Sequence, residues 1–381
     1  MIKSLKLSKF KSHVNSDVIF RNLTVLTGIN GYGKSSVIQA LLLLRQSFMK
    51  NLLMEGVDLN SPLVNLGNAN DVLSRYGKGA VLELVLENTD EQFRFEFDCE
   101  RYLTESFIPK ANYSDNITIA KLSSMPLFNN SFQYVSASRT GGRSLYGQDS
   151  YMVEKMHQLS SSEGKCDLLG HFLYRYGDES CYNYIDNMDG EECTLLEQVN
   201  AWETKISMYM QVRVEPDSSD KKNYKILYDV VDSHGKAIAT GLTASNVGYG
   251  LSYTLPVIVA LLAAKPNDLV VIENPEAHLH PAGQVALGEL ITMVANRGIQ
   301  VVVETHSDHI INAILISSKA ASEGREGIAS ENIAISYMGE MSIEQGTIVQ
   351  PITINGGVLD FQPKGFVDQY EHDLYLLRSN G

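Results

Sequence analysis

The sequence predicts an α/β fold with a mixed or parallel core sheet, an antiparallel β lobe and a helical insertion. Three observations predict this fold. An apolar strand at residues 22–27 and an unbroken helix at about 35–49 enclose a glycine-rich loop. From residue 245 the pattern runs helix, strand, helix, strand, helix, and its strands are the continuous apolar runs that parallel sheets bury on both faces. Between these blocks, alternating patterns predict mostly antiparallel strands, so the first and last blocks must share one sheet.

The individual elements follow from local patterns. Phe93, Phe95 and Phe97 alternate with charged residues, which indicates one half-buried strand of a hairpin. The predicted strands span residues 2–10, two segments within 17–27, then 81–87, 92–98, 117–122, 132–137, 208–214, 224–231, 269–272 and 300–303. Helices and long loops are expected over 139–203. We expect one split domain over 1–381, with an N-terminal lobe at 1–138, an insertion at 139–207 and a C-terminal lobe at 208–381.

Composition limits the classes of function. The 381 residues carry a net charge of −14, which opposes direct binding to DNA unless a basic patch or a partner supplies the charge. The longest apolar run, residues 255–264, is about half the length of a membrane-spanning helix. The first residues lack the apolar core of a signal peptide, so a cytoplasmic location without membrane contact is expected. The four cysteines have no metal-binding spacing and are expected to be free thiols.

The loop "GINGYGKS", residues 28–35, has the phosphate-loop pattern of a glycine, four residues, then Gly-Lys-Ser. Such a loop directs its backbone N–H groups and the positive end of the following helix at a polyphosphate. Lys34 is expected to reach the β- and γ-phosphates, and Ser35 to bind Mg²⁺. The residues predicted to hold the nucleotide in this loop are Gly28, Asn30, Gly31, Tyr32, Gly33, Lys34, Ser35 and Ser36.

Two later segments place acids at strand ends. In "DLVVIENPEAHLHPAGQ", residues 268–284, Glu273 ends an apolar strand. Mg²⁺ and its water need a carboxylate at the carboxyl end of the strand beside the phosphate loop, and Glu273 is predicted to fill that position. In "QVVVETHSDHI", residues 300–310, Glu304 and His306 stand at the end of the next strand. His306 is expected to contact the γ-phosphate and to sense its presence; in isolation, a structural histidine would be the simpler interpretation.

These motifs, in this order, resemble those of ABC-type ATPases of the RecF, SMC and OLD class. The loop resembles their Walker A motif, "VVIENPE" their Walker B motif and "ETHSDHI" their switch-histidine segment. "SNVGYGLSYTLPVIVALL", from Ser245, is similar to their signature motif, and "SKFKSH", residues 8–13, to a stretch that approaches the nucleotide. The resemblance implies ATP and Mg²⁺ as cofactors. It adds Lys11, Ser12, Ser245, Gly248 and Gly250 to the nucleotide-binding residues.

The resemblance also implies partners. ABC-type sites form between two subunits, so a homodimer or a higher homo-oligomer is expected. Within the class, "IENPEAHLHP", "SNVGYG" and the tail from residue 356 are most like small ATPases of anti-phage defence loci, such as PtuA of the Septu system. That likeness implies an effector from the same locus, a nuclease, as partner. The alternatives are an ATPase that clamps DNA for repair, and a slow or non-hydrolysing ATP sensor.

The sequence departs from the class at one catalytic position. The Mg²⁺-side acid is normally followed by a glutamate that polarises the attacking water, and here Asn274 follows Glu273. An amide can hold a water but cannot take its proton. The predicted catalytic residues are therefore Glu276 as base, His306, and Asn274 as a water ligand; without a base, turnover would be slow.

Four further polar residues leave alternatives open. Arg139 and Arg143 are expected either as solvated loop residues or facing the nucleotide or a partner. His278 and His280 form a His-x-His pair, for which a structural role is favoured over metal binding because a third ligand is lacking.

Overall fold

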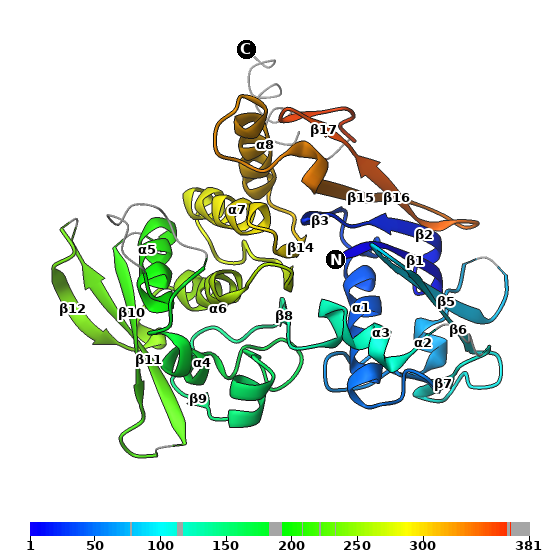
Figure 1. Ribbon diagram of the computed structural model, residues 1–381, viewed down its shortest axis with the longest axis horizontal. Helices are drawn as coiled ribbons and strands as arrows, with labels where there is room; N and C mark the ends of the chain where they lie inside the picture. The colour runs from blue at the N-terminus through cyan, green and yellow to red at the C-terminus, as the bar shows by residue number, and fades with distance from the viewer. Residues whose placement is uncertain are drawn as a thin grey trace, which may run out of the picture.

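The computed structural model describes residues 1–76, 78–112, 117–182, 193–207, 209–220, 222–232, 234–363 and 366. A 10-stranded sheet runs through this part of the chain (Figure 1). From one edge to the other its strands are β6 (Gln92–Asp98), β5 (Val81–Asn88), β1 (Ile2–Phe10), β2 (His13–Ile19), β16 (Gly346–Ile352), β15 (Ile333–Ser342), β3 (Leu23–Gly28), β14 (Gln300–Glu304), β13 (Leu269–Glu273) and β8 (Phe132–Val135). The predicted fold class is confirmed, and so is the sheet shared by the early and late strands.

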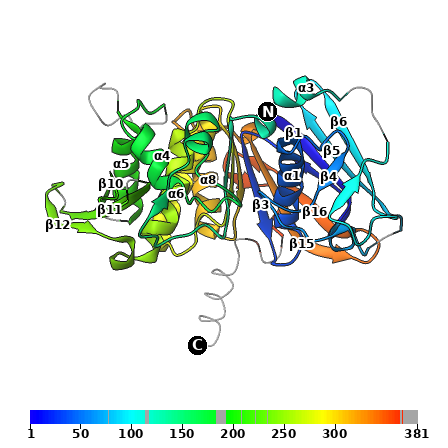
Figure 2. The same ribbon diagram turned by 90° about the horizontal axis from the view of Figure 1, so that it is seen from below.

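The parallel half of the sheet, β15-β3-β14-β13-β8, is covered on both faces. Every residue of β13 and β14 is buried. Val271 and Val302 pack in one core with the phosphate-loop helix, whereas Val270 and Val301 pack in another core with the later helices. Figure 2 shows α1 on one side of the sheet and α6 and α8 on the other. The helices are α1 (Lys34–Met49), α6 (Tyr249–Ala263), α7 (Pro281–Asn296) and α8 (Asp308–Ser322).

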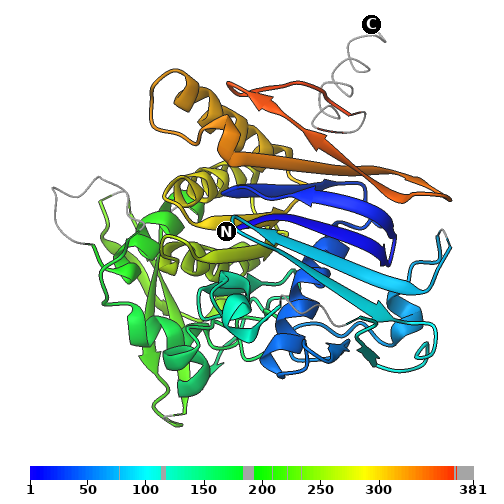
Figure 3. The same ribbon diagram turned by 45° about the vertical axis from the view of Figure 1, so that its right-hand side comes forward.

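The antiparallel half contains the N-terminal strand and the predicted hairpin. β1 pairs with both β2 and β5, and β5 pairs with β6. The side chains of Phe93, Phe95 and Phe97 are buried, as their alternation predicts. In Figure 3 the blue and cyan strands of this half run side by side.

A second, smaller sheet lies at the far side of the molecule, at the left of Figure 1. It consists of β10 (Met210–Pro216), β11 (Asn223–Val231), β12 (Ala237–Leu242) and the short β9 (Tyr146–Gly147). Helices α4 (Leu169–Tyr176) and α5 (Leu195–Ser207) pack between this sheet and α6 in the same core. The remaining short elements are β4 (Gly56–Asp58), α2 (Ala69–Val72), β7 (Phe107–Pro109), α3 (Ile119–Ser123), a π-helical turn (Tyr151–Lys155), 3-10 turns (Pro126–Phe128, Ala244–Asn246 and Ser330–Asn332), β17 (Ile354–Asn355) and β18 (Val358–Leu359).

One predicted strand is wrong and others have different ends. The strand predicted at 117–122 is the helix α3, because the Thr118 hydroxyl accepts the N–H of Lys121 and caps a helical turn. β2 begins at His13, earlier than predicted, and the strand predicted at 208–214 begins at Met210, with residue 208 outside the described residues. Among the described helices, none has both the length and the apolar character needed to span a membrane.

Candidate functional site

The phosphate loop contains two glycines at which the surrounding atoms leave no room for a side chain. Gly28 has a φ of +131°, and a Cβ there would lie 2.2 Å from the carbonyl oxygen of Met338 on β15. Gly33 has a φ of +91°, and its Cβ would lie 2.5 Å from Ser12 Oγ. Positive φ and these close approaches both require glycine. The neighbouring strands therefore fix the backbone of the loop.

The start of α1 has the features of an anion-binding helix end. Gly33 is the N-cap residue, no side chain caps the helix, and its first turn contains no acid. The positive end of the helix therefore lacks a counter-charge from its own turn. Lys34 Nζ donates to the carbonyl oxygens of Gly28 at 3.1 Å and Ile29 at 2.7 Å, and burial lowers the pKa of Lys34. At the tip of the loop, Asn30 and Gly31 are exposed.

The turn between β1 and β2 packs against the loop. His13 Nε2 lies 3.0 Å from the carbonyl oxygen of Gly33, and Ser12 Oγ accepts a hydrogen bond of 2.8 Å from Thr347. Lys11 Nζ donates to Gln39 Oε1 on α1 at 2.6 Å. Lys11 and Ser12, expected near the nucleotide from the resemblance, thus lie beside the loop and its helix. His13 was missed, although it follows directly in the same "SKFKSH" stretch.

Two glutamates lie opposite each other at the carboxyl ends of β13 and β14. Glu273 and Glu304 are register partners of this parallel pair. Ser35 Oγ donates to Glu304 Oε1 at 2.8 Å, whereas Glu273 Oε2 accepts the N–H of Ala137 at 3.1 Å. The prediction that Glu273 ends the strand beside the loop strand is wrong, because β14 lies between β3 and β13. The acid in contact with Ser35 is Glu304.

Burial dominates the electrostatics of both acids. It raises the pKa of Glu273, and the Ala137 N–H opposes that shift. Burial also raises the pKa of Glu304 to about 7, and the charge of Glu273 is the second cause. The positive charge of Lys34 lowers the pKa of Glu304 and so opposes this shift. Two facing carboxylates in a buried position favour a bound cation.

The turn after β13 is tied to the end of β14 by Glu276. Its Oε2 accepts the Thr305 hydroxyl and its Oε1 accepts the N–H of His306, both at 2.9 Å. The N–H of Asn274 donates to the carbonyl oxygen of Glu304 at 2.8 Å, and the φ of Asn274 is 44°. His306 is exposed; partial burial lowers the pKa of its ring, with Lys34 as the second cause. The three predicted catalytic residues therefore lie within one turn and the adjoining strand end.

Burial decides between the alternatives for Arg139. Arg139 is 1% exposed and donates to the backbone carbonyl oxygens of Glu273 and Asn274, each at 2.8 Å, so it is neither solvated nor facing out of the molecule. It braces the turn that carries Asn274. Arg143 is half-buried and donates to the Thr140 hydroxyl at 2.8 Å.

The His-x-His pair has two structural roles. His280 accepts the N–H of Ala282 and caps α7, and the ring of His278 packs 4.7 Å from the ring of Tyr253. Among the described residues, no group of three histidine, cysteine or acidic side chains could hold a metal ion.

The segment at residues 245–250 leads into α6. Gly248 is the N-cap residue, and a Cβ there would meet nothing within 4 Å. A Cβ on Gly250 would lie 2.7 Å from the carbonyl oxygen of His278, so α6 packs closely on the turn after β13. Ser245 Oγ pairs with Thr243 Oγ1 at 2.9 Å, and Tyr249 is 68% exposed. The predicted signature segment thus has open space beside Gly248 and an exposed aromatic ring at Tyr249.

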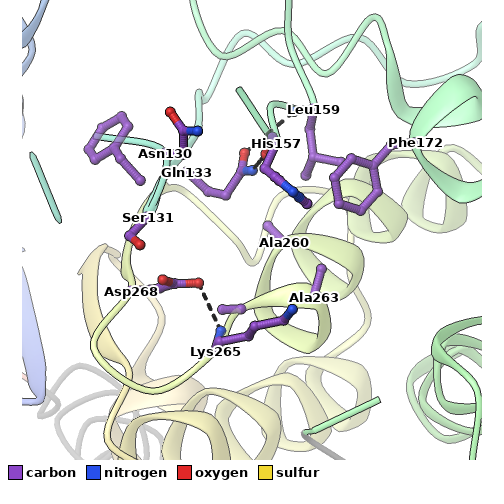
Figure 4. Close-up of a pocket in the computed structure, with 12 residues that line it drawn as sticks. Asn130, Ser131, Gln133, His157, Leu159, Phe172, Ala260, Ala263, Lys265 and Asp268 are labelled. Carbon is purple, nitrogen blue, oxygen red and sulfur yellow. Dashed lines mark hydrogen bonds between the residues drawn. The ribbon is translucent and has the colours of Figure 1, made fainter. Parts of the chain in front are cut away.

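A cavity of about 160 Å³ lies at the other ends of the same strands (Figure 4). Its lining includes Ser131 and Phe132 at the start of β8, and Asp268 immediately before β13. Asp268 Oδ2 accepts the N–H of Lys265 at 2.8 Å, as the dashed line in Figure 4 marks. Ligands of such sheets bind at the carboxyl ends of the strands. This cavity is therefore separate from the candidate site.

The fold and the loop together define the class of protein. A phosphate loop between β3 and α1, with acids ending the next two parallel strands and antiparallel strands on one side, is the arrangement of a P-loop ATPase of the ABC and SMC-head type. The chain belongs to the family described as "AAA domain, putative AbiEii toxin, Type IV TA system", whose model matches residues 23–125 and 185–312. No curated protein sequence matches the chain.

Solved SMC heads resemble the chain at low sequence identity. The chain is similar to an SMC head bound to the C-winged helix domain of ScpA, with a TM-score of 0.52, 13% identity, and coverage of 92% of this chain and 98% of that chain. For the SMC head domain from Thermotoga maritima the TM-score is 0.46 and the identity 15%, with coverage of 93% of this chain and 99% of that chain. A third structure is an SMC head with an extended coiled coil, bound to the C-terminal domain of ScpA from Pyrococcus furiosus. Its TM-score is 0.47 and its identity 12%, with coverage of 100% of this chain and 99% of that chain. The first of these likenesses supports the SMC-head fold.

Proposed function

We propose that the chain binds ATP with Mg²⁺ at the phosphate loop and hydrolyses it slowly, in a site that a second copy completes. The observation that carries this proposal is the contact between the first turn of α1 and the acids of the next strands. Ser35 Oγ lies 2.8 Å from Glu304 Oε1, and Glu273 is the register partner of Glu304. A hydroxyl and carboxylates beside phosphate oxygens are the ligands that Mg²⁺ prefers, so the residues fit the ion.

Slow hydrolysis follows from the side chains at the end of β13. Asn274 occupies the position of the expected base and can only hold a water. Glu276, the nearest alternative, already accepts hydrogen bonds on both carboxyl oxygens, from Thr305 and from the N–H of His306. We therefore assign Glu276 chiefly to positioning His306, which would respond to the γ-phosphate. General-base help is worth about 10²–10⁴-fold in rate, and a site without it holds ATP for longer.

Completion by a second copy is supported by the signature segment. Gly248 has open space around it, and Tyr249 is 68% exposed beside it. In the proposed dimer, this segment of one chain meets the γ-phosphate held by the loop of the other. Two such sites related by two-fold symmetry would close together.

The cellular role proposed is regulation of an effector protein, a nuclease, in anti-phage defence. It rests on the resemblance of the motifs to those of small defence ATPases such as PtuA of Septu. The SMC-head fold also supports a DNA-clamping role, as the second candidate, but the net charge of −14 counts against direct DNA binding. A solved relative of the same fold binds a winged-helix protein domain, which is consistent with a protein partner here.

Nucleotide binding and phosphate release by the purified protein test the core of this proposal. Wild type is expected to bind a fluorescent ATP analogue and to release phosphate slowly when Mg²⁺ is present. Lys34→Ala should lose tight binding, because it removes the ammonium that is expected to reach the β- and γ-phosphates. Lys155→Ala, at an exposed lysine in the π-helical turn, is the control and should behave as wild type. Normal ATP binding by Lys34→Ala would contradict the assignment of the loop.

A further inference from the structure

The end of β14 carries an acid that the expected site does not use. β14 lies between the loop strand β3 and β13, so its last residue is the strand-end acid next to the loop. Glu304 fills this position and accepts the hydroxyl of Ser35 at 2.8 Å. Ser35 is the residue whose hydroxyl is expected on Mg²⁺. A carboxylate that already contacts this hydroxyl is placed to share the same ion.

Glu304 also has an unsatisfied oxygen. Its side chain is 5% exposed, and its Oε2 atom has no hydrogen-bond partner within the described part of the chain. A buried carboxylate oxygen without a partner is costly, and native proteins satisfy nearly all such atoms. A bound cation would satisfy Oε2.

Glu273 stands in a different position. Its Oε2 is engaged by the backbone N–H of Ala137 at 3.1 Å. Its strand is one place further from the loop than β14. The ammonium of Lys34 donates to the loop carbonyl oxygens of Gly28 and Ile29.

From these contacts we infer that Glu304, together with Ser35, binds the divalent cation directly, and that Glu273 holds a water of that cation. The inference rests on the proposed function, because the nucleotide phosphates supply the remaining ligands. Mg²⁺ in nucleotide sites is commonly held by one or two carboxylates plus phosphate oxygens, which matches this set. The site therefore contains two carboxylates on neighbouring strands, and the one that binds the cation directly belongs to β14.

Electron paramagnetic resonance of Mn²⁺ tests this inference without using turnover. Mn²⁺ is titrated into the protein with a non-hydrolysable ATP analogue, for wild type, Glu304→Gln, Glu273→Gln and the exposed control Glu331→Gln. The glutamine at 304 keeps the shape and an acceptor for Ser35. Because it removes an inner ligand, Glu304→Gln is expected to weaken Mn²⁺ binding about tenfold or more, and by more than Glu273→Gln does. Glu331→Gln should match wild type.

Nucleotide binding in EDTA separates the two levels of the proposal. Glu304→Gln is expected to bind the analogue at least as tightly as wild type in EDTA, because one negative charge beside the phosphates is removed. Mn²⁺ affinity unchanged in Glu304→Gln, or lost mainly in Glu273→Gln, would overturn the inference while the proposed function stands. If Glu304→Gln lost binding of the ATP analogue in EDTA, the Glu304 side chain would only shape the loop, and this result would also overturn the inference. No nucleotide binding by wild type under either condition would instead overturn the proposed function.

Discussion

The phosphate loop and the signature segment at residues 245–250 differ in how much of their surroundings the chain itself supplies. At the loop, a Cβ on Gly28 would lie 2.2 Å from Met338 on β15, and one on Gly33 would lie 2.5 Å from Ser12. At the signature segment, a Cβ on Gly248 would meet nothing within 4 Å, and Tyr249 is 68% exposed. The loop is therefore built within one chain, whereas the glycine of the signature segment has room for another molecule. This difference is what the proposed two-chain site requires.

The largest effect is expected from the pair Gly28→Ala and Gly248→Ala. At Gly28 the methyl group would collide with a β-strand backbone at a φ of +131°. Strain of this kind costs about 1–3 kcal/mol before the collision is counted, so both stability and nucleotide binding should fall sharply. At Gly248, with a φ of −61°, the same methyl group should change neither. Thermal unfolding and binding of a fluorescent ATP analogue check the pair; equal effects at the two glycines would remove the contrast.

Gly248→Trp should separate binding from association. The indole is expected to fill the open space where the partner's nucleotide would approach, yet to leave the loop of the same chain intact. ATP-dependent dimerisation, measured by mass photometry with ATP and with ADP, should be lost, while ATP binding stays within about twofold of wild type. An ATP-induced dimer in the Trp variant would show that this segment does not face the partner. Closing a mostly open pair takes about 5.5 kcal/mol of preference, which two γ-phosphates must supply.

Asn274→Glu should increase turnover. The acid would stand where a base is expected, on a backbone that Arg139 and Glu304 already hold. Phosphate release is expected to rise about tenfold or more, below the full 10²–10⁴-fold of an optimised base. Asn274→Asp is the matched control, since its shorter side chain should reach the water less well and give a smaller gain. A rate below wild type in both variants would contradict the view that the missing base limits turnover.

The last contrast is between the two cores, whose buried ionisable side chains differ in their hydrogen bonds. Arg45, in the core on the loop side, donates to the carbonyl oxygens of Leu127 and Asn129. Glu203, in the core around α5 and α6, is fully buried, and neither of its oxygens has a hydrogen-bond partner among the described residues. Burial raises the pKa of Glu203 to about 8, from 4.5. The folded state therefore keeps this proton at pH values where the unfolded chain has lost it.

The sign of the pH effect follows from this proton. Between about pH 4.5 and pH 8 the unfolded state binds fewer protons, so the contribution of Glu203 to stability falls as pH rises and levels off above pH 8. At about 1.4 kcal/mol per pKa unit, the loss is about 3–5 kcal/mol. Glu203→Gln should remove this pH-dependent loss. The free energy of unfolding of the variant, measured relative to wild type, is therefore expected to be higher at pH 8.5 than at pH 6. Urea unfolding at both pH values measures the difference; an unchanged difference would contradict the buried, neutral carboxyl.

Local patterns predicted the parts of the site that lie next to each other in the chain. The loop, the start of α1 and the apolar strands ending at Glu273 and Glu304 all follow from short-range sequence rules. Contacts between distant residues did not, because they depend on the order of strands in the sheet. The bond between Ser35 and Glu304 requires β14 to lie beside β3, and the burial of Arg139 requires β8 to lie beside β13. The strand predicted at 117–122 failed because a Thr118 cap outweighed β-branched residues.

The central claim, that each site combines the loop of one chain with the signature segment of another, has one direct test. Lys34→Ala and Gly248→Trp should each release little phosphate alone. In a heterodimer of the two, one site would join an intact loop to an intact signature segment, and the other would carry both changes. An equimolar mixture is therefore expected to release phosphate faster than either variant alone, and each mixed dimer should reach about half of the wild-type rate at most, since one of its two sites works. A mixture no more active than the separate variants would contradict the claim.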